Sequence, residues 1–394
     1  MATSVPPTLT GSGDLLQLLR DGTARTRAEL VQLSSLGRAT VAARVDAMLE
    51  AGLLRRAPES VSTGGRPPTR FMIDHAARLV LAVDLGASHT SVALLDLGGR
   101  VLVERTVDSD IADGPAVVLE QVTALGRELL EEVQRPVSDV AGVGIGLPGP
   151  VEHATGRPAN PPIMPGWHDA DVPGLLQRTF PGPVLVDNDV NLMALGEQTR
   201  LRRTKHLMLV KVATGIGAGI VTDGRLLRGA LGAAGDLGHV QVAGAPDAPC
   251  RCGNTGGLEA VAAAPAIVQR LRAEGFDVHT SQDVVDAVSA GEVAALHAVR
   301  DAGRSIGTVL ATCVNLLNPS TIVIGGKLSE AGEYLLAGVR EVVYERSLPL
   351  ATNHLQIVGT SVGGRGALLG AGAMVVDAVL SAPAVDQFVA ARSA

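Results

Sequence analysis

Residues 79–90 read Leu-Val-Leu-Ala-Val-Asp-Leu-Gly-Ala-Ser-His-Thr, and this stretch decides which fold we expect. Its first part, residues 79–85, is a mainly apolar run of the length that a buried strand needs. Gly86 interrupts the run, and a second apolar run, residues 91–97, follows almost at once. Because no helix fits between them, the two strands should form a hairpin, and the sheet that contains them should be mixed rather than purely parallel.

Strand and helix patterns alternate along the chain beyond this hairpin. Apolar strand patterns occur at 140–146, 184–186, 207–212, 219–222, 226–227 and 321–324. Helical patterns lie between or after several of them, at 116–134, 265–274, 281–290, 293–317 and 329–343. This alternation predicts an α/β body. The sequence shows no period of the kind that marks a solenoid.

Two further segments place glycines at the ends of predicted strands. Residues 214–220 read Thr-Gly-Ile-Gly-Ala-Gly-Ile, and residues 322–326, which follow Asn-Leu-Leu-Asn-Pro at 315–319, read Ile-Val-Ile-Gly-Gly. Together with residues 84–90 and Asp96, they resemble in order and spacing the two phosphate motifs and the adenosine-side segment of the two-lobed actin-like ATPase and sugar kinase fold, which is ribonuclease H-like. A dinucleotide-binding Rossmann fold does not fit, because no Gly-x-Gly-x-x-Gly leads from the first strand into a helix.

This fold resemblance implies a phosphate or nucleotide site, either active or vestigial. In such hairpins, glycine lets backbone N–H groups approach phosphate oxygens closely. The positions that the resemblance assigns to the site are Asp84, Gly86, Thr214, Gly215, Gly217 and Gly325.

A more specific resemblance comes from residues 235–239, Gly-Asp-Leu-Gly-His, and residues 250–259, Cys-Arg-Cys-Gly-Asn-Thr-Gly-Gly-Leu-Glu. They resemble the signature of the ROK family (Repressor, Open reading frame, Kinase), which is Glu-x-Gly-His and then Cys-x-Cys-Gly-x-x-Gly-Cys-x-Glu. The chain departs from it at Asp236, where the family has Glu, and at Gly257, where it has a third Cys. The resemblance extends from about residue 79 to the C-terminus, about four-fifths of the chain.

The same signature bears on a metal. In the family, one His and three Cys hold a structural zinc ion, so the resemblance implies His239, Cys250 and Cys252 as ligands. Structural zinc is normally held by four protein ligands, and three remain here. Cys313 lies in an apolar helical run and is expected in the core. Three outcomes stay open: zinc held with a substitute ligand or water, weak binding, or no zinc.

Residues 186–191, Val-Asp-Asn-Asp-Val-Asn, end a strand and begin a helix. In ROK kinases, the Asp of this Asn-Asp pair takes the proton of the sugar hydroxyl, and the Asn binds the ring. The resemblance therefore implies Asp189 as the catalytic base, if the chain is a kinase, and Asn188 as a sugar contact. It completes the sugar pocket with Gly149, Asp236, His239 and Glu259. A simpler alternative is that Asp-Asn-Asp only caps the helix.

A small helical domain precedes this body. Residues 14–19 and 38–51 have helical patterns, and between them Thr26 and Glu29 fit a capping box that starts a second short helix. Residues 53–73 then resemble a two-stranded wing whose tip, residues 62–68, reads Ser-Thr-Gly-Gly-Arg-Pro-Pro. This order predicts a winged helix-turn-helix.

The third helix of this domain would enter the DNA major groove. Its buried stripe is Val41, Val45, Met48 and Leu49, and the residues expected to face DNA are Arg38, Ala39, Thr40, Ala43 and Arg44. Arg66, at the wing tip, could enter the minor groove. The alternative is that the domain binds protein, because helix-turn-helix patterns are common false positives.

Charge is distributed unevenly along the chain. Residues 1–78 hold ten Arg and seven Asp or Glu, a net charge of +3. The whole chain has a net charge of −7, so residues 79–394 carry −10. A basic head on an acidic body is typical of a DNA-binding module joined to a ligand-binding domain. Three cysteines, no secretory signal and no apolar run of membrane-spanning length predict a cytoplasmic protein without a membrane partner.

We therefore expect a flexible segment at 1–13, a winged helix-turn-helix at 14–76 and a two-lobed α/β body at 77–394. Lobe 1 should comprise residues 77–190 with a C-terminal helix at 372–394, and lobe 2 residues 191–371. The main hypothesis is a sugar-responsive transcriptional regulator, a repressor of carbohydrate genes. It would bind a sugar or sugar phosphate between the lobes and, as a homodimer or homotetramer, a palindromic DNA operator.

Two other functions remain open. The first is an active ATP- and Mg²⁺-dependent sugar kinase that carries a DNA-binding head. Asp189 and the glycines at 215–219 favour it, whereas Ala87 and His89 add side chains to the first phosphate hairpin and count against it. The other is an interaction scaffold without a small ligand, which leaves the clustered polar residues of the predicted pocket unexplained.

Overall fold

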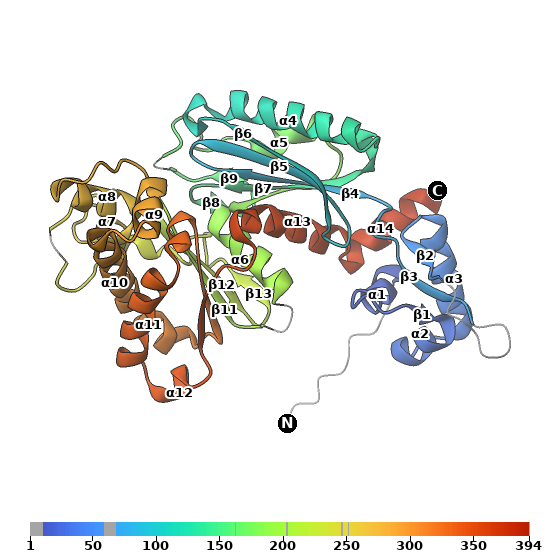
Figure 1. The fold of residues 1–394 in the computed structure, drawn as a ribbon. Coiled ribbons are helices and arrows are strands. Elements are labelled where there is room, and N and C mark those ends of the chain that lie inside the picture. The colour runs from blue at the N-terminus through green and yellow to red at the C-terminus, as the bar shows by residue number, and fades with distance from the viewer. Residues whose placement is uncertain are drawn as a thin grey trace.

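The computed structural model describes residues 11–58, 68–161, 163–201, 204–245, 247–250 and 252–393. Two five-stranded sheets form the body, and a small helical head lies at one end of it (Figure 1). Among the described residues, no single helix has the length and apolar character needed to span a membrane. Within the described ranges, one bent pair of helical segments, Gly363–Val379 and Ala382–Arg392, meets those two criteria together, with a 63° bend between them.

The first sheet, which we call lobe 1, contains the predicted hairpin. Its strands are β4 (Leu79–Leu85), β5 (His89–Asp96), β6 (Val101–Asp108), β7 (Val140–Leu147) and β10 (Val184–Asn188), in the order β10-β7-β4-β5-β6. β4, β5 and β6 are antiparallel, and β7 and β10 run parallel to β4, so the predicted mixed sheet is confirmed. Helices α4 (Pro115–Glu132) and α5 (Val172–Gln177) bury the apolar residues of one face.

The second sheet, lobe 2, repeats this topology. Its strands are β11 (Leu207–Val212), β12 (Ile216–Thr222), β13 (Arg225–Leu227), β14 (Thr321–Gly325) and β15 (Gln356–Gly359), in the order β13-β12-β11-β14-β15. The first three are antiparallel and the last two run parallel to β11. The duplication is confined to topology, which is why the search for sequence repeats does not find it.

Helices cover one face of the lobe 2 sheet and form its core. They are α7 (Leu258–Ala262), α8 (Ala264–Ala273), α9 (Ser281–Ser289), α10 (Val293–Leu317), α11 (Glu333–Arg346) and α12 (Pro349–Thr352). The helix predicted at 329–343 is instead the short turn Lys327–Ala331 followed by α11, because Gly332 adopts a positive φ of 65° between them. A small hairpin, β8 (Val151–Glu152) and β9 (Arg157–Pro158), follows β7.

Two helices lie between the sheets and join the lobes (Figure 1). Helix α6 (Asp189–Arg200) packs on β11 and β12 of lobe 2, and α13 (Gly366–Val379) packs on β4 and β7 of lobe 1. The helices touch each other through glycines: a Cβ at Gly196 would overlap the carbonyl oxygen of Gly366, and one at Gly370 would overlap that of Leu192. Their backbones are therefore in direct contact, so movement of one helix must move the other.

The head contains α1 (Ser12–Gln17), α2 (Arg27–Ser34) and α3 (Arg38–Glu50), with a sheet of order β1-β3-β2 formed by Arg25–Thr26, Arg70–Ile73 and Leu54–Arg56. The predicted capping box is present, since the Thr26 side chain accepts from the Glu29 N–H and the Glu29 carboxylate from the Thr26 N–H. The predicted wing tip lies mostly in residues 59–67, outside the described residues.

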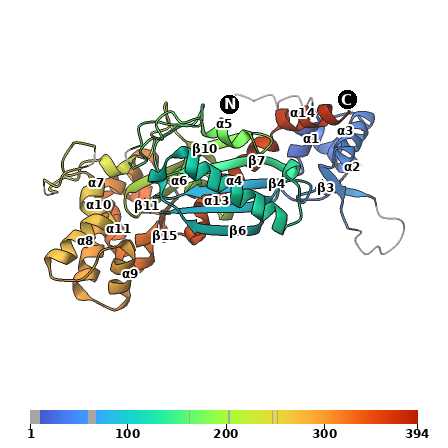
Figure 2. The ribbon, with the colours of Figure 1, turned by 90° about the horizontal axis from the view of Figure 1, so that it is seen from above.

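The C-terminal segment differs from the single helix expected at 372–394. It forms two helices, α13 and α14 (Ala382–Ser393), and α14 packs against α1 and α3 of the head (Figure 2). Pro383 explains the break, because it has no N–H to donate and its ring would clash with the carbonyl of Val379 in a continuous helix. Leu15 and Leu16 of the head share a buried cluster with Val385 and Val389 of α14.

Candidate functional site

The predicted Asp-Asn-Asp segment lies where β10 ends and α6 begins. Asn188 caps α6, because its side-chain oxygen accepts from the Val190 N–H at 3.0 Å. Its side-chain amide donates to the carbonyl of Gly149 at 3.1 Å. The capping role is therefore present at Asn188, and the same side chain brings Gly149 beside it, as the predicted pocket requires.

Asp189 is the next residue and makes a different contact. Its side chain is only 7% exposed, and the Lys211 ammonium, on β11, donates to its Oδ2 at 2.5 Å. Burial alone would lower the pKa of Lys211, but the ion pair with Asp189 outweighs it and raises that pKa above its ordinary value. The residue predicted to be a catalytic base is thus half of an ion pair that joins the two lobes.

The first predicted phosphate hairpin, between β4 and β5, is filled by His89. The imidazole lies 3.7 Å from the Asp84 carboxylate, and a Cβ placed on Gly86 would overlap its ring. The interaction with the Asp84 carboxylate raises the pKa of His89, although burial opposes that shift. The backbone that a phosphate would approach is therefore covered by a side chain.

The second predicted phosphate segment faces Glu259, a carboxylate predicted for the sugar pocket. The Ile216 N–H donates to Glu259 Oε2 at 3.2 Å, and a Cβ on Gly215 would lie 2.6 Å from that same oxygen. Thr214 lines a separate cavity of about 490 Å³, together with Ala264, Pro265, Val268, Gln269, Arg272, His279, Thr280 and Ser281. Gly217 and Gly325 lie on either side of Lys211 in the sheet.

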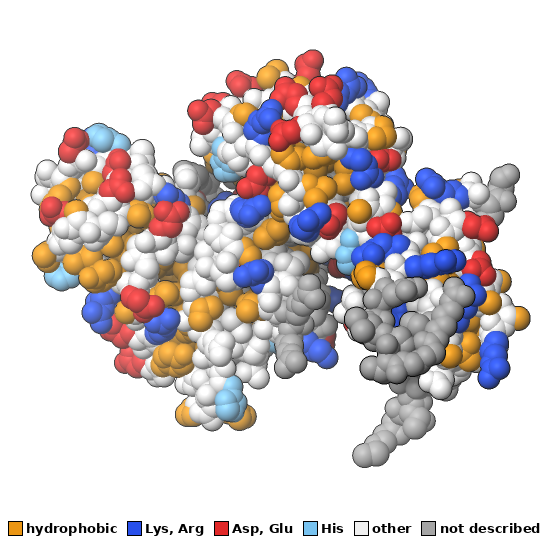
Figure 3. Space-filling view, turned by 45° about the vertical axis from the view of Figure 1, so that its right-hand side comes forward, with side chains coloured by type: hydrophobic (Ala, Val, Ile, Leu, Met, Phe, Trp, Pro, Cys, Tyr) orange, Lys and Arg blue, Asp and Glu red, His pale blue; other side chains and the backbone are white. Residues whose placement is uncertain are grey.

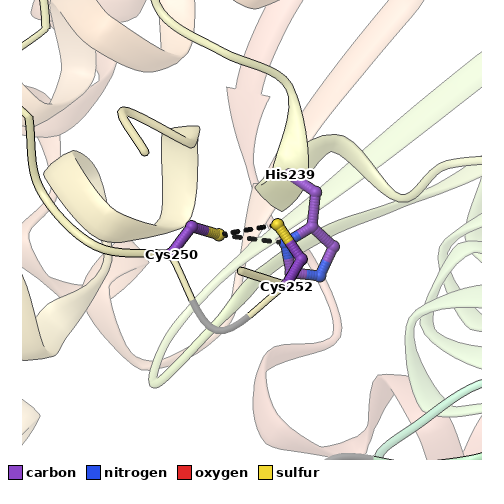
Figure 4. A group of neighbouring side chains, drawn as sticks. All are labelled: His239, Cys250 and Cys252. Carbon is purple, nitrogen blue, oxygen red and sulfur yellow. Dashed lines mark hydrogen bonds between the residues drawn. The ribbon is translucent and has the colours of Figure 1, made fainter. Parts of the chain in front are cut away.

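The three predicted metal ligands converge (Figure 4). Their ligand atoms all lie within 4.8 Å of one another, with His239 Nδ1 3.2 Å and Cys252 Sγ 3.3 Å from Cys250 Sγ. Burial raises the pKa of Cys250, whereas the hydrogen bond from the Asn254 N–H lowers that of Cys252. One imidazole and two thiols in one place are a donor set suited to zinc.

Position 257 faces the same cluster. A Cβ on Gly257 would lie 3.0 Å from Cys250 Sγ, so the backbone there points at the place where the family has its third Cys. The ligand set therefore fits a zinc ion on three sides and offers no protein ligand from position 257. Asp236, the other departure from the family pattern, has a side chain that is 55% exposed and 3.8 Å from His239 Nε2.

Two charged contacts at the cleft were not among the predicted site residues. One is made by Lys211. The other is made by Arg228, which follows β13 and donates to Asp187 Oδ2 over 2.7 Å. Lys211 carries a recognisable signal, because it is one of three lysines in the sequence and lies within an otherwise apolar strand run. Nothing comparable distinguishes Arg228 among the many arginines.

The head presents the predicted face of α3 to solvent. Arg38, Ala39, Thr40 and Ala43 are exposed, and Val41, Val45 and Met48 on the opposite side are buried. Arg44 is half-buried, and Arg66 lies outside the described residues. Figure 3 shows several basic side chains, in blue, on the head at the right of the view.

Comparison with known proteins places this geometry in a family. The model of the ROK family matches residues 80–378, which include both lobes, the cleft and the His-Cys-Cys cluster. The chain belongs to the ROK family. A ROK glucokinase from Halalkalibacterium halodurans is 32% identical to it over 315 residues, covering 76% of this chain and 95% of the glucokinase.

Other ROK relatives extend over the head as well. The putative xylose repressor of Caldicellulosiruptor sp. (strain Rt8B.4) is 29% identical over 384 residues, covering 94% of this chain and 96% of the repressor. A ROK family transcriptional regulator described as a homolog of the Escherichia coli MLC protein has a crystal structure that superposes with a TM-score of 0.84. It is 26% identical, and the match covers 96% of this chain and 98% of that one.

Proposed function

We propose that this ROK protein is a sugar-responsive transcriptional regulator that represses genes of carbohydrate uptake or metabolism in the cytoplasm. One observation carries the proposal: the xylose repressor relative matches 94% of the chain and so includes the head, whereas the glucokinase relative matches 76%. A head retained at full length argues that its binding partner, DNA, is part of the function.

In this proposal the head is a winged helix-turn-helix. Helix α3 enters the major groove, where Arg38 and Thr40 contact base edges or phosphates and Ala39 and Ala43 contact thymine methyl groups. Arg44 contributes from the flank of the helix, and Arg66 reaches the minor groove from the wing. The exposure of Arg38, Ala39, Thr40 and Ala43, opposite a buried stripe, supports this orientation.

The cleft holds the effector, a sugar or sugar phosphate. Gly149, Asn188 and Asp189 contact it from one side, and Asp236, His239 and Glu259 from the other. Hydrogen bonds that join Asn188 to Gly149 and Glu259 to Ile216 support this grouping, because they fix the side chains before a ligand arrives.

Effector binding reaches the head through the two central helices. The sugar contacts Asp189 at the first residue of α6, α6 touches α13 through glycines, and α14, which follows α13, lies in the head core. In a homodimer or homotetramer, a small change in this path reorients paired heads and shifts the population away from the arrangement that fits a palindromic operator.

Zinc, in our proposal, binds to His239, Cys250 and Cys252, with water in the fourth position. The ion would cross-link the loop after β13, which contains His239, to the segment before α7, which contains Cys250 and Cys252. This would hold Glu259, on α7, in place. Three protein ligands hold zinc less tightly than four, so we expect the metal to be removable by chelators under mild conditions.

The second candidate is an active ATP- and Mg²⁺-dependent sugar kinase, which the 32% identity to a glucokinase favours. Asp189, Thr214, Gly215 and Gly217 would then serve the sugar and ATP. The His89 ring over Gly86 and the ion pair at Asp189 both count against it. Incubation with ATP, Mg²⁺ and glucose, xylose or N-acetylglucosamine separates the candidates, because only a kinase forms the sugar phosphate.

DNA binding provides the main test. Duplexes selected from a random library by the full-length protein should bind the Arg38→Ala variant more weakly by about 1–3 kcal/mol, as measured by fluorescence anisotropy. Arg127→Ala, which removes an exposed arginine from α4 of the body, is the matched control and should bind like the original chain. Equal binding by both variants, or no DNA selected at all, would refute the proposal.

A further inference from the structure

Lys211 is placed in the cleft by the alternation of side chains along β11. Leu207 and Leu209 point toward α6 and share a buried cluster with its residues, whereas Met208 and Val210 belong to the core on the other face. Lys211 continues the first series, two residues beyond Leu209. Its side chain therefore reaches the first turn of α6, where Asp189 is.

The neighbouring strands contribute no side chains at this level. In the sheet, Lys211 pairs with Gly217 of β12 on one side and with Gly325 of β14 on the other. A lysine flanked by two glycines is the only side chain on this row of the three strands. Val190 and Met193 of α6 pack over the two glycines, so the Lys211 side chain lies between the sheet and the first turn of α6.

The charges in this part of the cleft balance. Lys211 pairs with Asp189 and Arg228 pairs with Asp187, while His89 lies 3.7 Å from Asp84 and His153 lies 3.5 Å from Asp187. The side chains of Asp189 and Asp187 are only 7% and 3% exposed, so their charges are weakly screened by water. Among the described residues of this cluster, Lys211 and Arg228 each have a carboxylate partner, and with His counted as neutral no positive charge is in excess.

This balance has a consequence for the ligand. A phosphate group would bring roughly two negative charges at neutral pH to a cluster whose cations are already paired. It would have to compete with Asp189 for Lys211, and breaking a buried ion pair is strongly unfavourable. A neutral hydroxyl requires no such competition, because a carboxylate has lone pairs left after accepting from one ammonium.

We propose that the Lys211–Asp189 ion pair makes the cleft selective for an unphosphorylated sugar. Asp189 accepts a hydrogen bond from a sugar hydroxyl, and Lys211 is held by Asp189 and is unavailable to a phosphate. The pair is thus the specificity-determining element for the class of effector. This inference rests on the proposed function, since it takes the cleft to be the sugar site.

Charge-changing variants test it by moving selectivity in opposite directions. The measured quantity is the ratio of the two dissociation constants, sugar phosphate over sugar, by calorimetry with glucose, N-acetylglucosamine and xylose and their terminal phosphates. In the original chain the ratio should be at least about ten. Asp189→Asn frees Lys211 and should lower the ratio at least about tenfold, whereas Lys211→Met leaves Asp189 unpaired and should raise it.

The control is Lys205→Met, which removes the same charge from an exposed position just before β11 and should leave the ratio unchanged. A purely structural role for the pair would weaken both ligands together and leave the ratio unmoved, and that result would overturn the inference. Preference of the original chain for a sugar phosphate would also overturn it. If the original chain bound none of the six compounds, both the sugar site and the inference would be refuted. If it bound them but the variants left the ratio of dissociation constants unchanged, only the inference would be refuted.

Discussion

At the scale of single residues, Gly257 determines how the His-Cys-Cys cluster is completed. Its backbone is extended (φ −62°, ψ 149°), so its dihedral angles suit a cysteine. The Cβ would lie 3.0 Å from Cys250 Sγ and 3.1 Å from the Gly238 carbonyl oxygen, so these neighbours must shift slightly. We expect Gly257→Cys to supply the fourth ligand. Sharing roughly 10–16 kcal/mol among four ligands gives about 3 kcal/mol each, so zinc affinity should rise on the order of 100-fold.

Competition with a chromophoric chelator measures that change, and cobalt substitution reports the coordination by its visible spectrum. Gly257→Ser is the matched control, because it adds a side chain of similar shape with a poorer zinc ligand. An equal gain for serine and cysteine, or none for either, would contradict the assignment of position 257 as the missing ligand.

The His89–Asp84 pair predicts a dependence of stability on pH. The pKa of His89 is raised above 6.5 in the folded protein by the neighbouring Asp84 carboxylate, so the protonated ring stabilises the fold. That contribution is fully present below pH 6.5 and is lost as the pH rises through the folded-state value. His89→Gln should therefore cost about 0.2–1 kcal/mol more at pH 5.5 than at pH 9, since the pair is partly exposed.

Urea denaturation of both proteins at the two pH values checks this. In an Asp84→Asn background, the same His89→Gln change should have no pH-dependent component, because the partner is gone. A pH-dependent difference that persists without Asp84 would show that another group is responsible.

Much of the site was predictable at this scale because its residues carry the chemistry of a known signature. His239, Cys250 and Cys252 form one group, and Asn188 and Gly149 form another. The ion pair of Lys211 with Asp189 was not predictable, because the two residues lie on different lobes and only the fold brings them into contact. The 55% exposure of the Asp236 side chain is a feature of loop geometry that spacing alone does not reveal, and its place in the pocket stays a prediction.

At the scale of helices and strands, the contact between α6 and α13 depends on glycine. Gly370→Ala would push a Cβ against the carbonyl oxygen of Leu192 in a rigid backbone, so we expect a loss of about 1–3 kcal/mol of stability. Gly364→Ala, where nothing lies within 4 Å, should change stability by less than about 0.5 kcal/mol. Chemical denaturation of the two variants measures the difference, and equal effects would mean that the helices have room to separate.

Element positions were predictable wherever the apolar pattern was strong. The helix expected at 293–317 and the strands at 79–85 and 207–212 have the predicted bounds. The duplicated sheet topology was not predictable, because strand order depends on contacts between distant segments. The division of the C-terminal helix was missed, although Pro383 is visible in the sequence, because the apolar pattern continues on both sides of it.

At the scale of the whole molecule, the proposed function requires that sugar and DNA affect each other equally. A sugar that binds the cleft should weaken DNA binding by about 5–150-fold, and DNA should weaken sugar binding by the same factor, because coupling free energy is reciprocal. Calorimetry of the sugar with and without a selected duplex, paired with anisotropy of the duplex with and without sugar, measures both factors. Asp189→Ala should retain DNA binding but lose the change in DNA affinity that sugar causes. Unequal fold-changes for sugar and DNA would mean that the two ligands act on different species.

The position of α14 in the head core also affects how the molecule is made. Gly13 donates a hydrogen bond to Asp386, a residue 373 positions later, so the head lacks part of its interior until α14 is synthesised. At about 5–20 residues per second, that delay is roughly 20–75 s. A polypeptide that lacks α14 would therefore have an incompletely packed DNA-binding head, and only chains that include α14 would bind the operator.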